Sequence, residues 1–452
     1  MKEILRQVIS DQHQQLSNEF FIERKIAQQL VDCNEILIIS GLRRCGKSVL
    51  LQQIREKQTE KDFFINFDDE RLVGFRVEHF QLLNELFIEL FGVQHHYYFD
   101  EIQNIIGWER FVRRLYDTGN KIIITGSNAT MLSKELGTHL TGRFCRYELY
   151  PFSFPEYLTY NKIPAPTNQL LSTPDKALIL KYFHLYLKMG GIPQYCVSKN
   201  DNVLKNLYES LVYRDIIVRN KISNELELMQ LLKYLATNAT QPVSYNNLSD
   251  LFSIKHVNTI KNYIKAIEDT YLLTQVYKYD FALKKQIVNA KKCYFIDNAL
   301  LHRIGFNATD NFGQLLENLV FIELKRRGKS LFYAQNGYEC DFIVEENNHI
   351  TDAIQVCYDL TNEKTKKKEV SGLLKAMDNY KLQEGLILTL DSEEELMIDN
   401  KSIFVKPVWK WLLFMNKDYN PPQKKIPSHF SKAYPDAEFQ CITLENYWDL
   451  II

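Results

Sequence analysis

The chain has 452 residues, of which 45% are hydrophobic and 25% are charged. At about 150 residues per domain, this length predicts roughly three globular units, and the composition excludes collagen-like and intrinsically disordered proteins. The 55 Lys and Arg residues nearly balance the 56 Asp and Glu residues, which gives a formal net charge of -1. No overall positive potential therefore attracts the molecule to DNA or to an anionic membrane, and any contact with nucleic acid must come from a local patch.

Neither a membrane span nor a secretion signal is expected. The apolar runs at 36–39 and 411–415 are far shorter than the roughly 18 residues that a membrane-spanning helix needs. Residues 1–15 lack the apolar core of a signal peptide. The eight cysteines include no C-x-x-C pair, which favours reduced thiols over disulfides or a zinc site. We expect a cytoplasmic protein.

The first part of the chain alternates between strand and helix patterns. A helix is expected at 19–33, and a second helical pattern lies at 108–119. Three short apolar runs predict strands, at 35–40, 95–99 and 121–125. Strands that alternate with helices imply a parallel sheet covered by helices. We therefore predict an α/β domain of the P-loop NTPase type at 15–160.

The segment GLRRCGKS at 41–48 matches the phosphate-binding motif G-x-x-x-x-G-K-[ST] in full, between a strand and a helix. Its glycines let backbone N–H groups surround phosphates, Lys47 can reach the β- and γ-phosphates of ATP, and the Ser48 hydroxyl can ligate Mg²⁺. A glycine-rich turn at a helix start is the alternative. The expected nucleotide-binding residues are Gly41, Arg43, Arg44, Cys45, Gly46, Lys47, Ser48 and Val49.

Two acidic residues follow the second expected strand. Asp100 would hold Mg²⁺, and Glu101 would polarise the attacking water. Such a pair is also common as negative charge at a helix N-terminus, where carboxylates are favourable. The motif before it favours the catalytic reading.

Two further polar groups are candidates for the ATPase site. Ser127 or Asn128, after the third strand, could hydrogen-bond the γ-phosphate or the water, or could simply cap the next helix. Arg143 could stabilise charge in the transition state, either in its own chain or in a neighbouring subunit. A solvated surface arginine is the other reading of Arg143.

The pattern at 175–285 is mostly helical. Three helices with short connections, at 225–238, 244–254 and 256–273, resemble a winged helix. One face of the third is apolar, and another carries Asn258, Lys261, Asn262 and Lys265. That polar face could contact DNA, with lysines on phosphates and asparagines on bases, or it could be an ordinary solvated surface.

A third α/β unit is expected at 290–415. It combines Glu317 on a helix with Asp341 on a strand, as in restriction-type nucleases, whose acidic residues collect Mg²⁺. The third position departs from that pattern, because Gln355 replaces the acid and Cys357 replaces the lysine. Gln is a neutral ligand and Cys is no fixed cation. We therefore expect a degenerate nuclease site. The polar tail at 416–452 has no assigned structure.

Together, GLRRCGKS, YYFDEIQN, ITGSN, LTGRF, ENLVF, ECDFIV and IQVCY resemble a large prokaryotic family. Its members join an AAA-type ATPase domain to a C-terminal domain of unknown function with a nuclease-like fold. The resemblance covers about 15–415 and implies ATP and Mg²⁺ as cofactors, with a sensor at Ser127 or Asn128 and a catalytic arginine at Arg143. Assembly into homo-oligomers is an expectation from the same source.

The sequence leads to three hypotheses about function. The first is an ATPase whose cycle acts on a C-terminal module that binds double-stranded DNA or a partner protein. The second is a slow nucleotide-dependent interaction switch. The third is an ATP-regulated nuclease in which another residue replaces the missing lysine.

Overall fold

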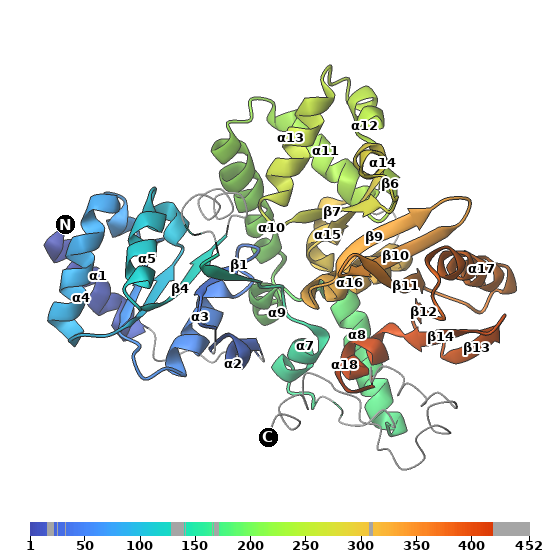
Figure 1. Ribbon diagram of the computed structural model, residues 1–452, viewed down its shortest axis with the longest axis horizontal. Coiled ribbons are helices and arrows are strands. Elements are labelled where there is room, and N and C mark those ends of the chain that lie inside the picture. Colours follow the sequence, from blue (N-terminus) through green and yellow to red (C-terminus); the bar gives the residue numbers. More distant parts are fainter. Residues whose placement is uncertain are drawn as a thin grey trace, which may run out of the picture.

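The computed structural model describes residues 1–15, 22–24, 26–31, 33–127, 140, 142–164, 166, 171–306 and 311–418. The described chain is built on two β-sheets, one in the N-terminal part and one in the C-terminal part, with helices between and around them (Figure 1). Asn128 and the tail beyond 418 lie outside the described residues. Within the described part, no helix combines the length and apolar character of a membrane span.

The N-terminal sheet has five parallel strands, so the predicted α/β fold class is confirmed. Their order is β2 (Phe63–Asn66), β3 (His96–Asp100), β4 (Lys121–Gly126), β1 (Ile36–Ser40) and β5 (Phe144–Glu148). Strand β1 reads as a continuous apolar run because both faces of a parallel sheet are covered. Leu37 and Ile39 belong to one hydrophobic cluster, whereas Ile36 and Ile38 belong to another.

Helices cover both faces of this sheet (Figure 1). Helix α3 (Lys47–Glu56) packs in the cluster of Leu37, and α4 (Phe80–Phe91) and α5 (Trp108–Asp117) pack in that of Ile36. Helix α1 (Lys2–Gln15) buries Leu5 in the latter core, so the folded unit begins before the predicted start at 15. The remaining short elements are α2 (Ile26–Val31), η1 (Glu70–Leu72), η2 (Val77–His79) and η3 (Ile102–Asn104).

A mostly helical region follows, as the sequence predicted. It contains α7 (Phe154–Tyr160), α8 (Thr173–Met189), α9 (Pro193–Ser198), α10 (Asp201–Glu209), the π-helix η4 (Ser210–Val218), α11 (Glu225–Thr237), α12 (Tyr245–Leu251), α13 (Val257–Glu268), α14 (Leu283–Val288) and α15 (Asn298–Ile304). Helices α11, α12 and α13 occupy the three predicted positions. On α13 the apolar face is buried through Ile260, Ile264 and Ile267.

The second sheet has nine strands and runs across the predicted boundary between the second and third units. Its order is β13 (Glu394–Ile398), β14 (Lys401–Pro407), β12 (Glu384–Thr389), β11 (His349–Cys357), β10 (Glu339–Glu346), β9 (Ser330–Gln335), β7 (Leu273–Lys278), β8 (Lys291–Phe295) and β6 (Pro242–Val243). Strands β7 and β9 join the two halves. Helices α16 (Phe312–Arg326), α17 (Glu363–Tyr380) and α18 (Val408–Asp418) accompany the sheet.

Candidate functional site

The loop between β1 and α3 has the backbone shape that its two glycines allow. Gly41 has a φ of 143°, and a Cβ atom there would lie 2.4 Å from the carbonyl oxygen of Leu149. Gly46 precedes the first helical residue and has a φ of 100°. Side chains are strained in this left-handed region. The glycines therefore fix a turn that points the N-terminus of α3 into the loop, where its N–H groups favour an anion.

Lys47 is buried beneath the loop, with 3% of its side chain exposed. Its ammonium group donates hydrogen bonds to the carbonyl oxygens of Gly41 at 3.3 Å and Leu42 at 3.1 Å. The Nζ atom also lies 3.7 Å from Oε1 of Glu101, which directly follows strand β3. The loop thus places one fixed positive charge against its own carbonyls and the predicted catalytic carboxylate.

Asp100 ends β3 and is 1% exposed. Burial, and then the negative charge of Glu101, raise the pKa of Asp100 to about 6. Hydrogen bonds from Thr125 and Ser48 act in the opposite direction, and the Thr125 hydroxyl donates to Oδ1 of Asp100 at 2.5 Å. The structure thus brings Ser48 and Asp100 together, as predicted, and adds Thr125, which lies one strand away on β4.

Glu101 is oriented by hydrogen bonds with three neighbouring side chains, those of Thr125, Gln103 and Ser127. Its backbone is left-handed, with a φ of 51°, and its N–H donates to Oγ1 of Thr125 at 3.0 Å. Oε2 of its carboxylate accepts hydrogen bonds from the Gln103 amide at 2.5 Å and from the Ser127 hydroxyl at 3.2 Å. Ser127 therefore contacts the predicted base. Gln103 was not singled out in the sequence, although it lies two residues after Glu101.

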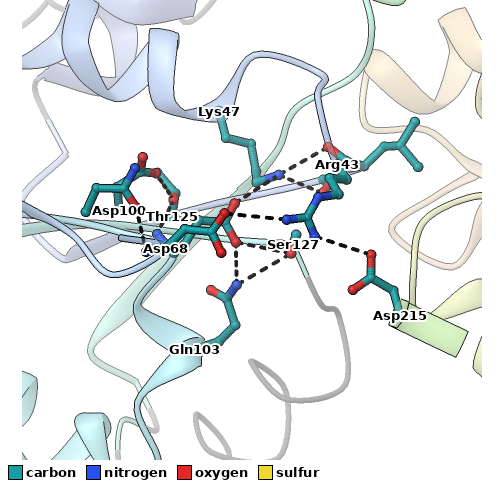
Figure 2. Close-up of polar contacts among 12 residues, drawn as sticks. Arg43, Lys47, Asp68, Asp100, Gln103, Thr125, Ser127 and Asp215 are labelled. Atoms are coloured by element: carbon teal, nitrogen blue, oxygen red, sulfur yellow. Dashed lines mark hydrogen bonds and ion pairs between the residues drawn. The ribbon is translucent and has the colours of Figure 1, made fainter. Parts of the chain in front are cut away.

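Arg43 connects the phosphate loop to the helical region (Figure 2). Its guanidinium group lies 3.5 Å from Oδ2 of Asp68 and 3.7 Å from Oδ2 of Asp215. Asp68 is also paired with Arg214, and Asp215 with Arg219. Asp215 belongs to the π-helix η4 and has 5% of its side chain exposed. π-Helical segments are rare and frequently occur at functional sites.

The remaining loop residues have different environments. Arg44 is exposed with a φ of 64°, and Val49 is partly buried in the first turn of α3. Cys45 is fully buried, and burial raises the pKa of its thiol. A protonated buried thiol is a weak nucleophile, so we expect Cys45 to contribute to the packing of the core and not to the chemistry. The guanidinium group of Arg24 donates to the Cys45 carbonyl oxygen at 2.8 Å and holds this part of the loop.

Arg143 lies at the end of the sheet that is opposite to the phosphate loop. Its carbonyl oxygen accepts from the N–H of Ile36, the first residue of β1, whereas the phosphate loop follows Ser40 at the opposite end of that strand. Its side chain pairs with Asp117 at 3.2 Å. The parallel register of β1 and β5 therefore keeps Arg143 away from the phosphate loop of its own chain. A role in a neighbouring subunit stays a prediction.

A second cluster of charged groups lies in the C-terminal sheet. The ammonium group of Lys292, on β8, lies 2.9 Å from Oδ1 of Asp341, 3.2 Å from Oε1 of Glu317 and 3.5 Å from Oε1 of Glu339. The Tyr294 hydroxyl donates to Glu317 at 2.7 Å. The predicted pair of Glu317 and Asp341 is thus brought together, around a lysine that the sequence reading missed. Two adjacent lysines directly before the apolar run CYFI at 293–296 were the available signal in the sequence.

Gln355 also belongs to this cluster, but Cys357 points to a different partner. Oε1 of Gln355 accepts the N–H of Asp341 at 3.2 Å, and its amide donates to Glu369 at 2.6 Å. The Cys357 thiol donates to the carbonyl oxygen of Asp359 at 3.2 Å. Gln355 therefore links the backbone of Asp341 to the carboxylate of Glu369.

Replacing Glu317 by glutamine should change how stability depends on pH. Burial, and then the charge of Asp341, raise the pKa of Glu317 from 4.5 to about 7. Its contribution to the free energy of unfolding is therefore present below pH 4.5 and is lost as the pH rises through 7. Between pH 4.5 and pH 7, the native chain should lose about 3 kcal/mol of stability relative to Glu317→Gln. Urea unfolding of both chains at several pH values measures this loss. A stability difference that stays constant with pH would contradict a raised pKa for Glu317.

Comparison with known proteins agrees with the N-terminal architecture. An AAA domain matches residues 33–158, and a domain of unknown function, DUF8612, matches residues 180–310. The AMPPCP-bound DnaA from Aquifex aeolicus aligns over 54% of this chain and 85% of that chain, with 16% identity and a TM-score of 0.25, a similarity too low to bear on function. The AAA-type part of the predicted resemblance is thus confirmed.

Two relatives match almost the whole chain. The uncharacterized protein MJ1544 of Methanocaldococcus jannaschii is 35% identical over 436 residues, which are 91% of this chain and 96% of that protein. An uncharacterized protein of Haemophilus influenzae is 32% identical over 418 residues, which are 88% of this chain and 98% of that protein. The chain therefore carries an AAA domain and belongs to the same family as these archaeal and bacterial proteins.

Proposed function

We propose that the protein is a Mg²⁺-dependent ATPase whose nucleotide cycle acts on the helical and C-terminal parts of the chain. One observation supports this most directly. Lys47, Ser48, Asp100 and Glu101 lie together at the carboxyl ends of strands β1 and β3. Glu101 is oriented there by Gln103 and Ser127.

The residues at these strand ends fit ATP and Mg²⁺. The Ser48 hydroxyl and the Asp100 carboxylate are neighbouring oxygen donors, which is the ligand type that Mg²⁺ prefers. Lys47 and the loop N–H groups would hold the phosphates. Mg²⁺ supplies neutralisation of phosphate charge, and Glu101 would orient the attacking water and accept its proton.

The contact between Arg43 and Asp215 supports a connection between this site and η4. Phosphate oxygens are strong acceptors for arginine, so bound ATP would compete with Asp68 and Asp215 for the same guanidinium group. Asp215 is buried, and a buried carboxylate that loses a positive partner is costly to keep in place. Nucleotide binding would therefore bias the position of η4.

Replacing Arg43 by alanine should reduce the nucleotide response of η4 by at least half. In the native chain, saturating ATP analogue should alter amide hydrogen exchange at 210–218, because Arg43 changes partner. Arg43→Ala should abolish at least half of this change, whereas Arg44→Ala, an exposed arginine of the same loop, should leave it intact. Equal responses in the native and Arg43→Ala chains would exclude the route through Arg43.

The partner of the cycle is either double-stranded DNA or another protein. On α13, Asn258, Lys261 and Asn262 are exposed, and exposed lysines can contact phosphates. Lys265 lies 2.9 Å from Asp269, which neutralises part of this face. Steady-state ATP hydrolysis with Mg²⁺, with and without DNA, separates the two cases. Stimulation by DNA that Glu101→Gln removes supports DNA, and a slow rate indifferent to DNA supports a protein-interaction switch.

A further inference from the structure

Lys292 lies inside the cluster of carboxylates in the C-terminal sheet. Lys292 is 1% exposed, and three carboxylates lie within 3.5 Å of its ammonium group. They come from two elements that are distant in sequence from β8, because Glu317 lies on α16 and Asp341 and Glu339 lie on β10. The ammonium group is thus the centre of the cluster.

A nuclease-like arrangement would require a divalent cation between Glu317 and Asp341. In this structure both carboxylate oxygens of Asp341 and Oε1 of Glu317 accept hydrogen bonds from protein donors. Oδ1 of Asp341 accepts from Lys292 and Oδ2 accepts from the N–H of Val356 at 3.0 Å. Oε1 of Glu317 accepts from Lys292 and from the Tyr294 hydroxyl. The donor set does not fit a metal ion as well as it fits a lysine.

Charge leads to the same conclusion. Burial lowers the pKa of Lys292, but the carboxylates of Asp341 and Glu317 outweigh burial, so the net pKa is raised and the group stays positive at neutral pH. A divalent cation between the same carboxylates would lie next to this fixed charge, in an interior where repulsion is only weakly screened. The neutral Gln355, in place of an acid, further lowers the negative charge available to a metal.

We infer that the Lys292 ammonium group takes the place of a divalent cation among Glu317, Glu339 and Asp341. The cluster is then a metal-free ion-pair centre that ties β8 to α16 and β10, and it does not support metal-dependent cleavage of phosphodiesters. This inference concerns the C-terminal sheet and does not depend on ATP hydrolysis by the N-terminal domain.

A Mn²⁺ titration of the full nucleotide-free chain, followed by electron paramagnetic resonance, tests the inference. The native chain and Asp341→Asn should take up Mn²⁺ equally, because the cluster holds none. Lys292→Ala removes the ammonium group and leaves space, so it should bind one Mn²⁺ more than the native chain does. Lys292→Ala combined with Asp341→Asn should lose that ion.

Lys291→Ala is the matched control, since Lys291 is 3% exposed on the same strand but donates to the carbonyl oxygens of Ile287 and Asn289. It should gain no Mn²⁺. Uptake by the native chain that Asp341→Asn removes would overturn the inference, and so would a folded Lys292→Ala chain that gains no ion. Should Lys292→Ala fail to fold, the comparison of the native chain with Asp341→Asn decides alone.

Discussion

Replacing Glu101 by glutamine should slow ATP hydrolysis by about 10² to 10⁴-fold, the usual contribution of a positioned general base. Glutamine keeps the shape of the side chain and can still contact Gln103 and Ser127, which orient Glu101 in the native chain. It cannot accept a proton from water. ATP binding should change little, because Lys47 and the loop N–H groups remain. Phosphate release measures turnover, and a fluorescent ATP analogue measures binding.

The matched control for this substitution is Glu89→Gln. Glu89 is an exposed glutamate that pairs with Lys2 and Arg6 on the outer surface of the same domain. Its replacement should leave turnover within about twofold of the native rate, since surface ion pairs contribute little. Native turnover in Glu101→Gln would remove Glu101 from the catalytic role and would leave the water to another group.

Replacing Lys292 by methionine should lower the free energy of unfolding by about 3 to 5 kcal/mol, the usual cost of removing one partner from a buried ion pair. Methionine retains most of the volume of the side chain, so the cost arises from charge and not from a cavity. Asp341 and Glu317 would remain buried without their cation. Urea unfolding monitored by circular dichroism measures the difference.

Two comparisons separate this charge effect from a general effect of mutating β8. Lys291→Met leaves two carbonyl oxygens without this donor and removes a cation from above the Tyr245 ring, but it leaves no carboxylate unpaired, so it should cost only about 1 to 2 kcal/mol. Lys292→Met combined with Asp341→Asn removes both charges and should recover part of the lost stability. A double variant as unstable as the sum of its single variants would show that the two groups do not stabilise each other.

Contiguous motifs explain why much of the ATPase site could be predicted. The phosphate loop combines eight adjacent residues with a preceding strand, and Asp100 and Glu101 follow directly after another. The parallel sheet followed from alternating strand and helix patterns, and the buried face of α13 followed from helical periodicity. These features depend on neighbours in sequence, which a single chain displays.

Contacts across the sheets were not accessible in the same way. Thr125 reaches Asp100 from the adjacent strand, and Lys292 reaches Asp341 across 49 positions of sequence. Arg143 was a candidate for stabilising transition-state charge in its own chain or in a neighbouring subunit, and the register that pairs Ile36 with Phe144 places it far from the phosphate loop of its own chain only. Strand order and register come from packing of the whole fold, so one sequence without relatives does not reveal them.

The nine-stranded sheet has a practical consequence for dissecting the protein. Strands β7 and β9 pair through Tyr277 with Phe332 and Lys278 with Tyr333. A fragment that ends near residue 285 would expose the β7 edge and would also lack β8, its antiparallel neighbour. Unpaired strand edges recruit other chains and promote aggregation. The two halves of this sheet should therefore be expressed together, and a cut for studying the AAA domain alone belongs before the helical region.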